Sequence, residues 1–123
     1  MTGPDRPSVL LVEDDADLRG LVAEILEHDG WRVVAMAGPD EAIAVLRQGA
    51  FDLIITDGYR GSGVPLDGSV CLLELAGDRP VVLFTARQVP RDEAVATGFR
   101  DVILKPFDLG EFEERIRRVI KRY

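Results

Sequence analysis

Short runs of aliphatic residues alternate along the chain with segments in which apolar residues recur every three or four positions. Continuous aliphatic runs are typical of strands buried on both faces, and the three- to four-residue spacing is typical of amphipathic helices. We expect strands at 8–13, 32–36, 53–57, 81–85 and 101–104, and helices that begin near 15, 39, 69, 91 and 108. This βα alternation predicts an α/β fold with a parallel sheet.

Residues with strong positional preferences mark the predicted helix ends. Asp15 or Asp14 can cap the first helix and Asp108 the last, because a carboxylate accepts hydrogen bonds from the exposed N–H groups of a first turn. Gly30 and Gly98 can end the first and fourth helices in the left-handed conformation that glycine adopts readily. The helices and strands therefore follow one another with short connections.

Length and charge limit the classes of partner. A chain of 123 residues is expected to form a single domain over 1–123, with 1–7 as a flexible N-terminus. The net charge of −7 argues against direct contact with nucleic acid or an anionic membrane, both of which need a basic surface. Cys71 is the single cysteine, and neither a signal-peptide core nor a membrane-spanning run is found, so we predict a cytoplasmic protein.

Polar residues with chemical potential stand at the ends of four predicted strands. Glu13 with Asp14, then Asp57, Thr85 and Lys105 each follow an aliphatic run. Ligands of open α/β sheets bind beyond the carboxyl ends of the strands, so these side chains are expected to converge. Three acids, a hydroxyl and an amine indicate metal-assisted phosphoryl chemistry.

Four segments, in order, resemble the receiver domain of bacterial two-component response regulators: LLVEDDADL, DLIITD, PVVLFTA and DVILKPF. The resemblance extends over nearly the whole chain, and the ordered set is far more specific than any one segment. It implies a flavodoxin-like, doubly wound sheet of five parallel strands in the order 2-1-3-4-5, with helices on both faces. It also implies a regulatory switch rather than an enzyme that turns over a separate substrate.

The resemblance assigns a role to each strand-end residue. Asp57 is similar to the phosphoacceptor that receives a phosphoryl group from a histidine kinase or phosphotransfer protein. A Mg²⁺ ion would be held by Glu13, Asp14 and Asp57 with the backbone carbonyl of Tyr59, Asp14 contacting it directly and Glu13 through water. The physical reason is that a hard divalent cation relieves the repulsion among clustered carboxylates.

The remaining two residues are implied to sense and bind the phosphoryl group. Lys105, followed by Pro106 in an expected cis Lys-Pro bond, would pair with a phosphoryl oxygen. Thr85 would turn its hydroxyl toward the modified aspartate and report its state. The family then signals to a downstream protein through the face formed by helix 4, strand 5 and helix 5.

The chain departs from the family pattern in its signalling parts. Val102 stands where receivers usually carry an aromatic switch residue, three positions before the lysine. The segment Tyr59–Gly68 is longer than usual and rich in glycine, which predicts a loop. Tyr59 and Arg87, two residues beyond Asp57 and Thr85, are bulky or charged and suggest slow self-dephosphorylation.

Two other functions remain open from the sequence. The altered loop and Val102 suit a pseudo-receiver, a protein-binding module of the same fold that works without phosphorylation. A small phosphohydrolase or flavin-binding protein would share the sheet. Flavin binding is disfavoured because acids, rather than a phosphate cradle, follow the first strand, and a hydrolase lacks an evident general base.

Overall fold

A parallel sheet forms the centre of the protein. The computed structural model describes residues 6–49, 51–57, 59–60, 64–65, 73–85, 90–105 and 108–121. Its main strands are β1 (Ser8–Val12), β2 (Arg32–Met36), β3 (Leu53–Thr56), β6 (Val81–Thr85) and β7 (Asp101–Leu104). They lie in the order β2-β1-β3-β6-β7, and each neighbouring pair is parallel. Counted along this sheet the order is 2-1-3-4-5, which confirms the predicted fold.

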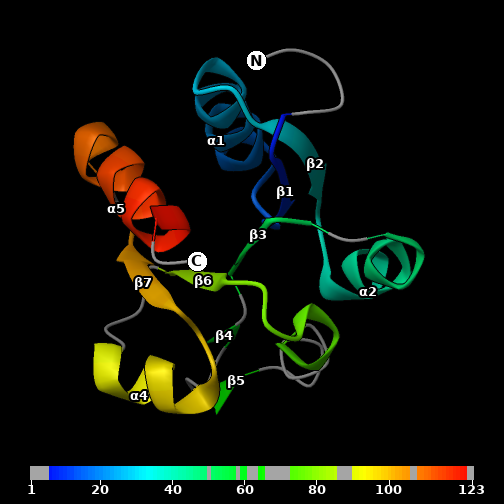
Figure 1. Ribbon diagram of the computed structural model, residues 1–123, viewed down its shortest axis with the longest axis vertical. Coiled ribbons are helices and arrows are strands. Elements are labelled where there is room, and N and C mark those ends of the chain that lie inside the picture. Colours follow the sequence, from blue (N-terminus) through cyan, green and yellow to red (C-terminus); the bar gives the residue numbers. More distant parts are fainter. Residues whose placement is uncertain are drawn as a thin grey trace.

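Helices cover both faces of this sheet (Figure 1). The described helices are α1 (Ala16–His28), α2 (Pro39–Gln48), α4 (Arg91–Thr97) and α5 (Leu109–Lys121), and residues 73–76 are also helical. Helices α1 and α5 pack on one face, while α2, α4 and 73–76 pack on the other. Among the described helices, none is both long and apolar enough to span a membrane.

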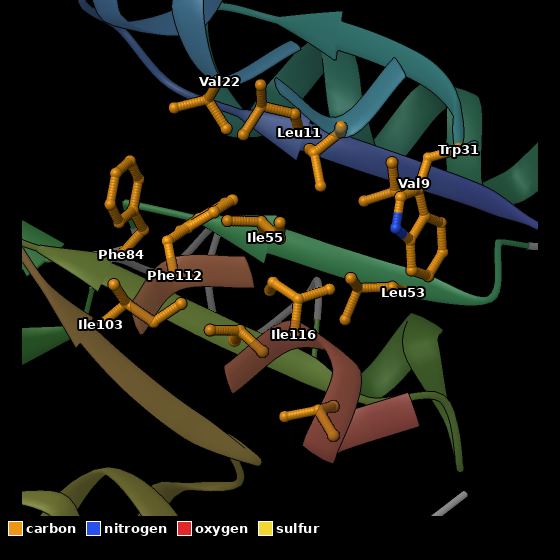
Figure 2. Close-up of a cluster of buried hydrophobic side chains, with 13 residues drawn as sticks. Val9, Leu11, Val22, Trp31, Leu53, Ile55, Phe84, Ile103, Phe112 and Ile116 are labelled. Atoms are coloured by element: carbon orange, nitrogen blue, oxygen red, sulfur yellow. The ribbon is translucent and has the colours of Figure 1, made fainter. Parts of the chain in front are cut away.

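The face covered by α1 and α5 is held by a continuous apolar cluster. Phe112 and Ile116 of α5 and Val22 of α1 point at the strands in Figure 2, where they meet residues such as Leu11 and Ile55. Phe112 is fully buried, and its ring centroid lies 5.8 Å from that of Phe84. Burial of each such large side chain stabilises the fold by about 1.5–3 kcal/mol. This packing fixes the strands whose ends carry the polar residues.

The predicted helix ends are confirmed where the structure describes them. Of the two candidates for the first cap, Asp15 fills the position, and its Oδ1 accepts a hydrogen bond from the Leu18 N–H at 3.1 Å. Asp108 accepts the Glu111 N–H at 2.9 Å at the start of α5. Gly30 and Gly98 have φ angles of 99° and 128°, a region that side chains disfavour. Local chemistry therefore determines where these helices begin and end.

Some predicted boundaries differ from the structure. Strands β1 and β3 end at Val12 and Thr56, one residue earlier than predicted. The N–H groups of the next residues, Glu13 and Asp57, still donate to neighbouring strands, so the difference is confined to the last residue of each strand. The expected helix over 69–76 is described only at 73–76, since 69–72 lie outside the described residues. Most of the expected flexible N-terminus, 1–5, also lies outside them.

The prediction of an unbroken loop after Asp57 is wrong. Two short strands, β4 (Tyr59–Arg60) and β5 (Val64–Pro65), pair in antiparallel fashion, Tyr59 opposite Pro65. Tyrosine and valine favour extended backbone, which is compatible with this pairing. The glycine-rich composition indicated a loop and gave no sign of the two-residue pairing between β4 and β5.

Candidate functional site

The strand ends meet at one edge of the sheet, as predicted. Strands β1 and β3 are neighbours in a register that sets Val12 beside Thr56, so Glu13 and Asp57 leave the sheet side by side. Strands β6 and β7 pair Thr85 with Leu104, and the Lys105 N–H donates to the Thr85 carbonyl at 2.8 Å. Four segments far apart in sequence thus supply one site.

Three carboxylates form a cluster at this edge. One oxygen from each of Glu13, Asp14 and Asp57 lies within 4.8 Å of the others. Glu13 is fully buried, Asp57 is half-buried and Asp14 is exposed, so the cluster opens to solvent on one side. Oxygen ligands at this spacing suit Mg²⁺. Tyr59 opens β4 two residues after Asp57, and the role of its carbonyl as a further ligand stays a prediction.

Asp57 lies in an environment that disfavours its charge. Burial, followed by the side-chain hydrogen bond with Asp14 and the negative charges of Glu13 and Asp14, raises the pKa of Asp57 to about 6. The Asp14 N–H donates to Asp57 Oδ2 at 3.3 Å and acts in the opposite direction. Asp57 is still mostly ionised at neutral pH and can act as a nucleophile.

Lys105 reaches into the cluster from the end of β7. Its Nζ lies 2.6 Å from Glu13 Oε1 and 4.9 Å from the centre of the Phe84 ring. The Lys105 side chain is 19% exposed, whereas that of Glu13 has no exposure. Among the ion pairs of the described residues, Lys105 is bonded to Glu13 and not to Asp57. Pro106, and with it the expected cis bond, lies outside the described residues.

Two residues that support the site were missed from the sequence. The Arg19 guanidinium donates to the Glu13 carbonyl at 2.9 Å and ties the end of β1 to α1. Phe84 places its ring beneath the Lys105 ammonium. Arg19 is the fourth residue of the helix that follows Glu13, and Phe84 directly precedes Thr85. Their closeness in sequence to the predicted site residues was the signal that could have identified them.

The predicted reporter and the unusual switch position lie on neighbouring strands. Thr85 is buried at the end of β6, which places it at the site edge; its movement toward a phosphoryl group stays a prediction. Val102 is only 7% exposed and packs with Leu83 and Phe99 in the cluster beneath α2 and α4. The position at which the resemblance predicts an aromatic switch residue therefore holds a buried aliphatic side chain. Arg87 lies outside the described residues.

This fold and edge geometry define a class of protein. The sequence model of the response regulator receiver domain matches residues 9–117, and the chain therefore belongs to this family. Receiver domains are the signalling modules of two-component systems, and they act as switches rather than as conventional enzymes. They generally bind Mg²⁺ at an acidic pocket, and the Glu13, Asp14 and Asp57 cluster provides such a group of acids.

Known relatives agree with this assignment. The chain is 35% identical over 118 residues to the phosphate regulon transcriptional regulatory protein PhoB of Escherichia coli. The aligned region covers 93% of this chain and 52% of PhoB. The chain is 31% identical to the transcriptional regulatory protein YvrH of Bacillus subtilis, covering 96% of this chain and 51% of YvrH. The chain thus spans about half the length of these relatives.

Solved structures show the same architecture. The non-phosphorylated HemR receiver domain of Leptospira biflexa aligns with a TM-score of 0.80 at 34% identity, covering 94% of both chains. The chemotaxis response regulator CheY4 of Vibrio cholerae aligns with a TM-score of 0.79 at 25% identity, covering 93% of this chain and 98% of CheY4. Both are similar along nearly the whole of the present chain.

Proposed function

We propose that this domain is a phosphoacceptor switch in which Asp57 receives a phosphoryl group from a partner histidine kinase or phosphotransfer protein. The observation that carries the proposal is the convergence of Glu13, Asp14 and Asp57 within 4.8 Å, with the Lys105 ammonium bonded to one of the three. Membership of the receiver family supports the same role.

The transfer uses the ionised Asp57 carboxylate as the nucleophile. One of its oxygens attacks the phosphorus of a phosphohistidine, the P–N bond breaks, and its electron pair returns to the imidazole nitrogen. The product is an acyl phosphate on Asp57. Because the pKa of Asp57 is raised only to about 6, the reactive charged form predominates at neutral pH.

The neighbouring residues bind and orient the transferred group. Glu13, Asp14 and Asp57, with the carbonyl of Tyr59, would hold Mg²⁺, which supplies positive charge against the phosphoryl oxygens. Lys105 would pair with one phosphoryl oxygen. The Thr85 hydroxyl would lie beside a second phosphoryl oxygen. Its movement would transmit the change at Asp57 to β6.

The output is proposed to pass to a protein partner through the face of α4, β7 and α5. Because Val102 is aliphatic and packed, that face cannot use the aromatic rotation usual in receivers. PhoB and YvrH are transcriptional regulators of which this chain matches about half, and the acidic net charge of −7 argues against DNA contact by the present chain. A cytoplasmic location fits this role.

A pseudo-receiver is the second candidate, and packed Val102 is the observation that favours it. Such a protein would keep the fold and bind partners without phosphorylation. The complete set of acids and Lys105 at the sheet edge favours the first proposal instead.

Phosphorylation can be tested with a small acyl phosphate donor, Mg²⁺ and intact-mass measurement. We expect a single phosphate adduct on the wild type and none on Asp57→Asn. Asp78→Asn, which changes an exposed aspartate in the turn after residues 73–76, is the matched control and should form the adduct normally. An unmodified wild type under these conditions would support the pseudo-receiver, and steady turnover of the donor without a retained adduct would support a hydrolase.

A further inference from the structure

A cavity lies at the first residue of β7, the opposite end of this strand from the phosphoacceptor site. It has a volume of about 320 Å³. Helices α4 and α5 lie on either side of β7, which is the last strand in the sheet order (Figure 1). The described residues that line the cavity come from α4, β7, α5 and the turn before β7: Arg91, Arg100, Asp101, Arg115, Arg118 and Val119.

The lining has an excess of positive charge in a protein whose net charge is negative. Four of these lining residues are arginines, and Asp101 is the one acid among them. The whole chain, by contrast, has a net charge of −7. A concave surface lined by one sign of charge raises the local concentration of ions of the opposite sign. This cavity is therefore suited to an anion.

Asp101 uses only part of the hydrogen-bonding capacity of the arginines. It accepts from Arg91 Nε at 3.2 Å and from Arg115 Nη1 at 3.1 Å. Each guanidinium has five N–H donors in a planar fork, and the Arg91 and Arg115 side chains are 56% and 33% exposed. Both side chains can therefore hold Asp101 and still donate to a ligand.

The remaining ion pairs of the α5 arginines are exposed and easily exchanged. Arg115 Nε lies 3.6 Å from Glu111 Oε1, and Arg118 Nη2 lies 2.9 Å from Glu114 Oε1. Both glutamates are more than half exposed, and exposed pairs four residues apart on a helix are weak and screened by salt. An anion with several charges can replace these glutamates.

We propose that this cavity binds a diphosphate group, either free or carried by a nucleotide. Arginine forks bind phosphate oxygens through paired, charge-assisted hydrogen bonds. A diphosphate has enough oxygens to meet Arg91 of α4 together with Arg115 and Arg118 of α5. The volume of the cavity lies at the lower end of the range of about 300–1,000 Å³ that is usual for small-molecule sites.

The charges around the cavity favour a small anion over nucleic acid or an acidic protein. Asp92 and Glu93 are exposed in the first turn of α4, next to Arg91. Glu111 and Glu114 are exposed on α5. These acids repel an extended polyanion, whereas a small anion meets mainly the arginines. The ligand would lie on the face of α4, β7 and α5, which is the face proposed for output.

Calorimetric titration with inorganic pyrophosphate, without divalent cations, tests the site. We expect saturable binding by the wild type with a Kd below about 1 mM. Arg91→Gln and Arg118→Gln should each weaken binding about 5- to 20-fold, because each removes charge-assisted hydrogen bonds. Arg117→Gln is the matched control: it removes the same charge from the residue next to Arg118, but Arg117 lines a separate cavity with Trp31. Its affinity should stay within about twofold of the wild type.

Three results would overturn the proposal. Binding that does not saturate below about 1 mM pyrophosphate would show that the cavity is not a site. Equal weakening by Arg117→Gln and Arg118→Gln would show a general attraction to the basic end of α5. Unchanged binding by Arg91→Gln would show that the anion does not lie between α4 and α5.

Thermal unfolding provides a second readout and a check that each variant is folded. Pyrophosphate should raise the Tm of the wild type more than sodium chloride of equal ionic strength does, because it binds the folded state. The increase should be smaller for Arg91→Gln and Arg118→Gln than for Arg117→Gln. Equal increases in all three variants would contradict the proposed site.

Titration with ADP distinguishes the two sources of the diphosphate. Tighter binding of ADP than of pyrophosphate would assign the site to a nucleotide, and equal or weaker binding would assign it to free diphosphate. This proposal does not depend on phosphorylation of Asp57. The mass adduct on Asp57 and the binding of pyrophosphate are separate measurements, so either result can stand without the other.

Discussion

Strand β7 joins two charged clusters of opposite design. Beyond its last residue, Lys105 faces the three carboxylates of the candidate metal site, Glu13, Asp14 and Asp57. At its first residue, a buried Asp101 accepts from Arg91 Nε at 3.2 Å and from Arg115 Nη1 at 3.1 Å. Asp101 also accepts from the Val102 N–H at 2.8 Å. The first cluster holds Asp57 beside two further carboxylates, whereas the second pairs its one buried acid, Asp101, with two arginines.

The difference shows how a small domain separates function from stability. Burial, followed by the hydrogen bond with Asp14 and the negative charges of Glu13 and Asp14, raises the pKa of Asp57. A cation would relieve the repulsion among these acids, as the proposed function requires. The Asp101 network ties α4 and α5 to β7, on the face proposed for output. Removal of a carboxylate charge should therefore have opposite effects on stability at Asp101 and at Asp57.

The largest stability effect is expected at the Asp101 network. Asp101→Asn keeps the shape and an acceptor for the Val102 N–H but leaves Arg91 and Arg115 without their buried partner. We expect a loss of about 2–3 kcal/mol in the free energy of unfolding, less than for a wholly buried pair because both arginines are partly exposed. Urea denaturation measures it. A change below about 0.5 kcal/mol would show that this cluster behaves as an ordinary surface network.

At Asp57, removal of the carboxylate charge is expected to increase the free energy of unfolding. Its folded-state pKa of about 6 exceeds the ordinary value of 3.8, so between those two pH values the native state binds more protons than the unfolded state. The contribution of Asp57 to the free energy of unfolding therefore falls as pH rises through this window. Above the window, the ionised carboxylate destabilises the folded state to its full extent. Asp57→Asn should stabilise the metal-free protein by about 1–2 kcal/mol near pH 7.5, allowing for solvent screening.

The pH dependence and the metal provide the controls for Asp57→Asn. Near pH 4 the two proteins should differ much less, because the Asp57 carboxyl is then almost fully protonated in the folded state and close to its ordinary pKa of 3.8 in the unfolded state. Saturating Mg²⁺ should reduce or reverse the difference, because it binds the folded wild type. Greater stability of the wild type at every pH without metal would contradict a repulsive cluster.

The sequence predicted which residues lie at the sheet edge better than it predicted which of them bond to one another. Aliphatic runs ending in Glu13, Asp57 and Lys105 were enough to place these residues at one sheet edge, because parallel strands align their carboxyl ends. That Lys105 pairs with Glu13 rather than with Asp57 depends on side-chain positions across 92 residues of sequence. Periodicity carries no information about such a choice.

The proposed output face of α4, β7 and α5 was likewise only partly predictable. Val102 could be recognised as aliphatic, but its burial against Leu83 and Phe99 depends on how α4 sits on the sheet. The short ladder of β4 and β5 was missed because two-residue strands give no alternating pattern. Long-range packing decides both features, and composition alone pointed to a loop.

The smallest effect on the free energy of unfolding is expected at Arg118. Its ion pair is exposed, so comparison with the Asp101 network isolates the contribution of burial. Arg118 Nη2 lies 2.9 Å from Glu114 Oε1, closer than the Arg115–Asp101 contact, but the two side chains are 63% and 62% exposed. An exposed i,i+4 pair stabilises a helix by about 0.3–0.5 kcal/mol, and salt screens it. Arg118→Gln, which keeps helix propensity similar, should cost about that much in low salt and almost nothing near 1 M salt, measured by urea denaturation alongside Asp101→Asn. If the two variants lost equal stability, proximity of opposite charges rather than burial would explain the Asp101 network.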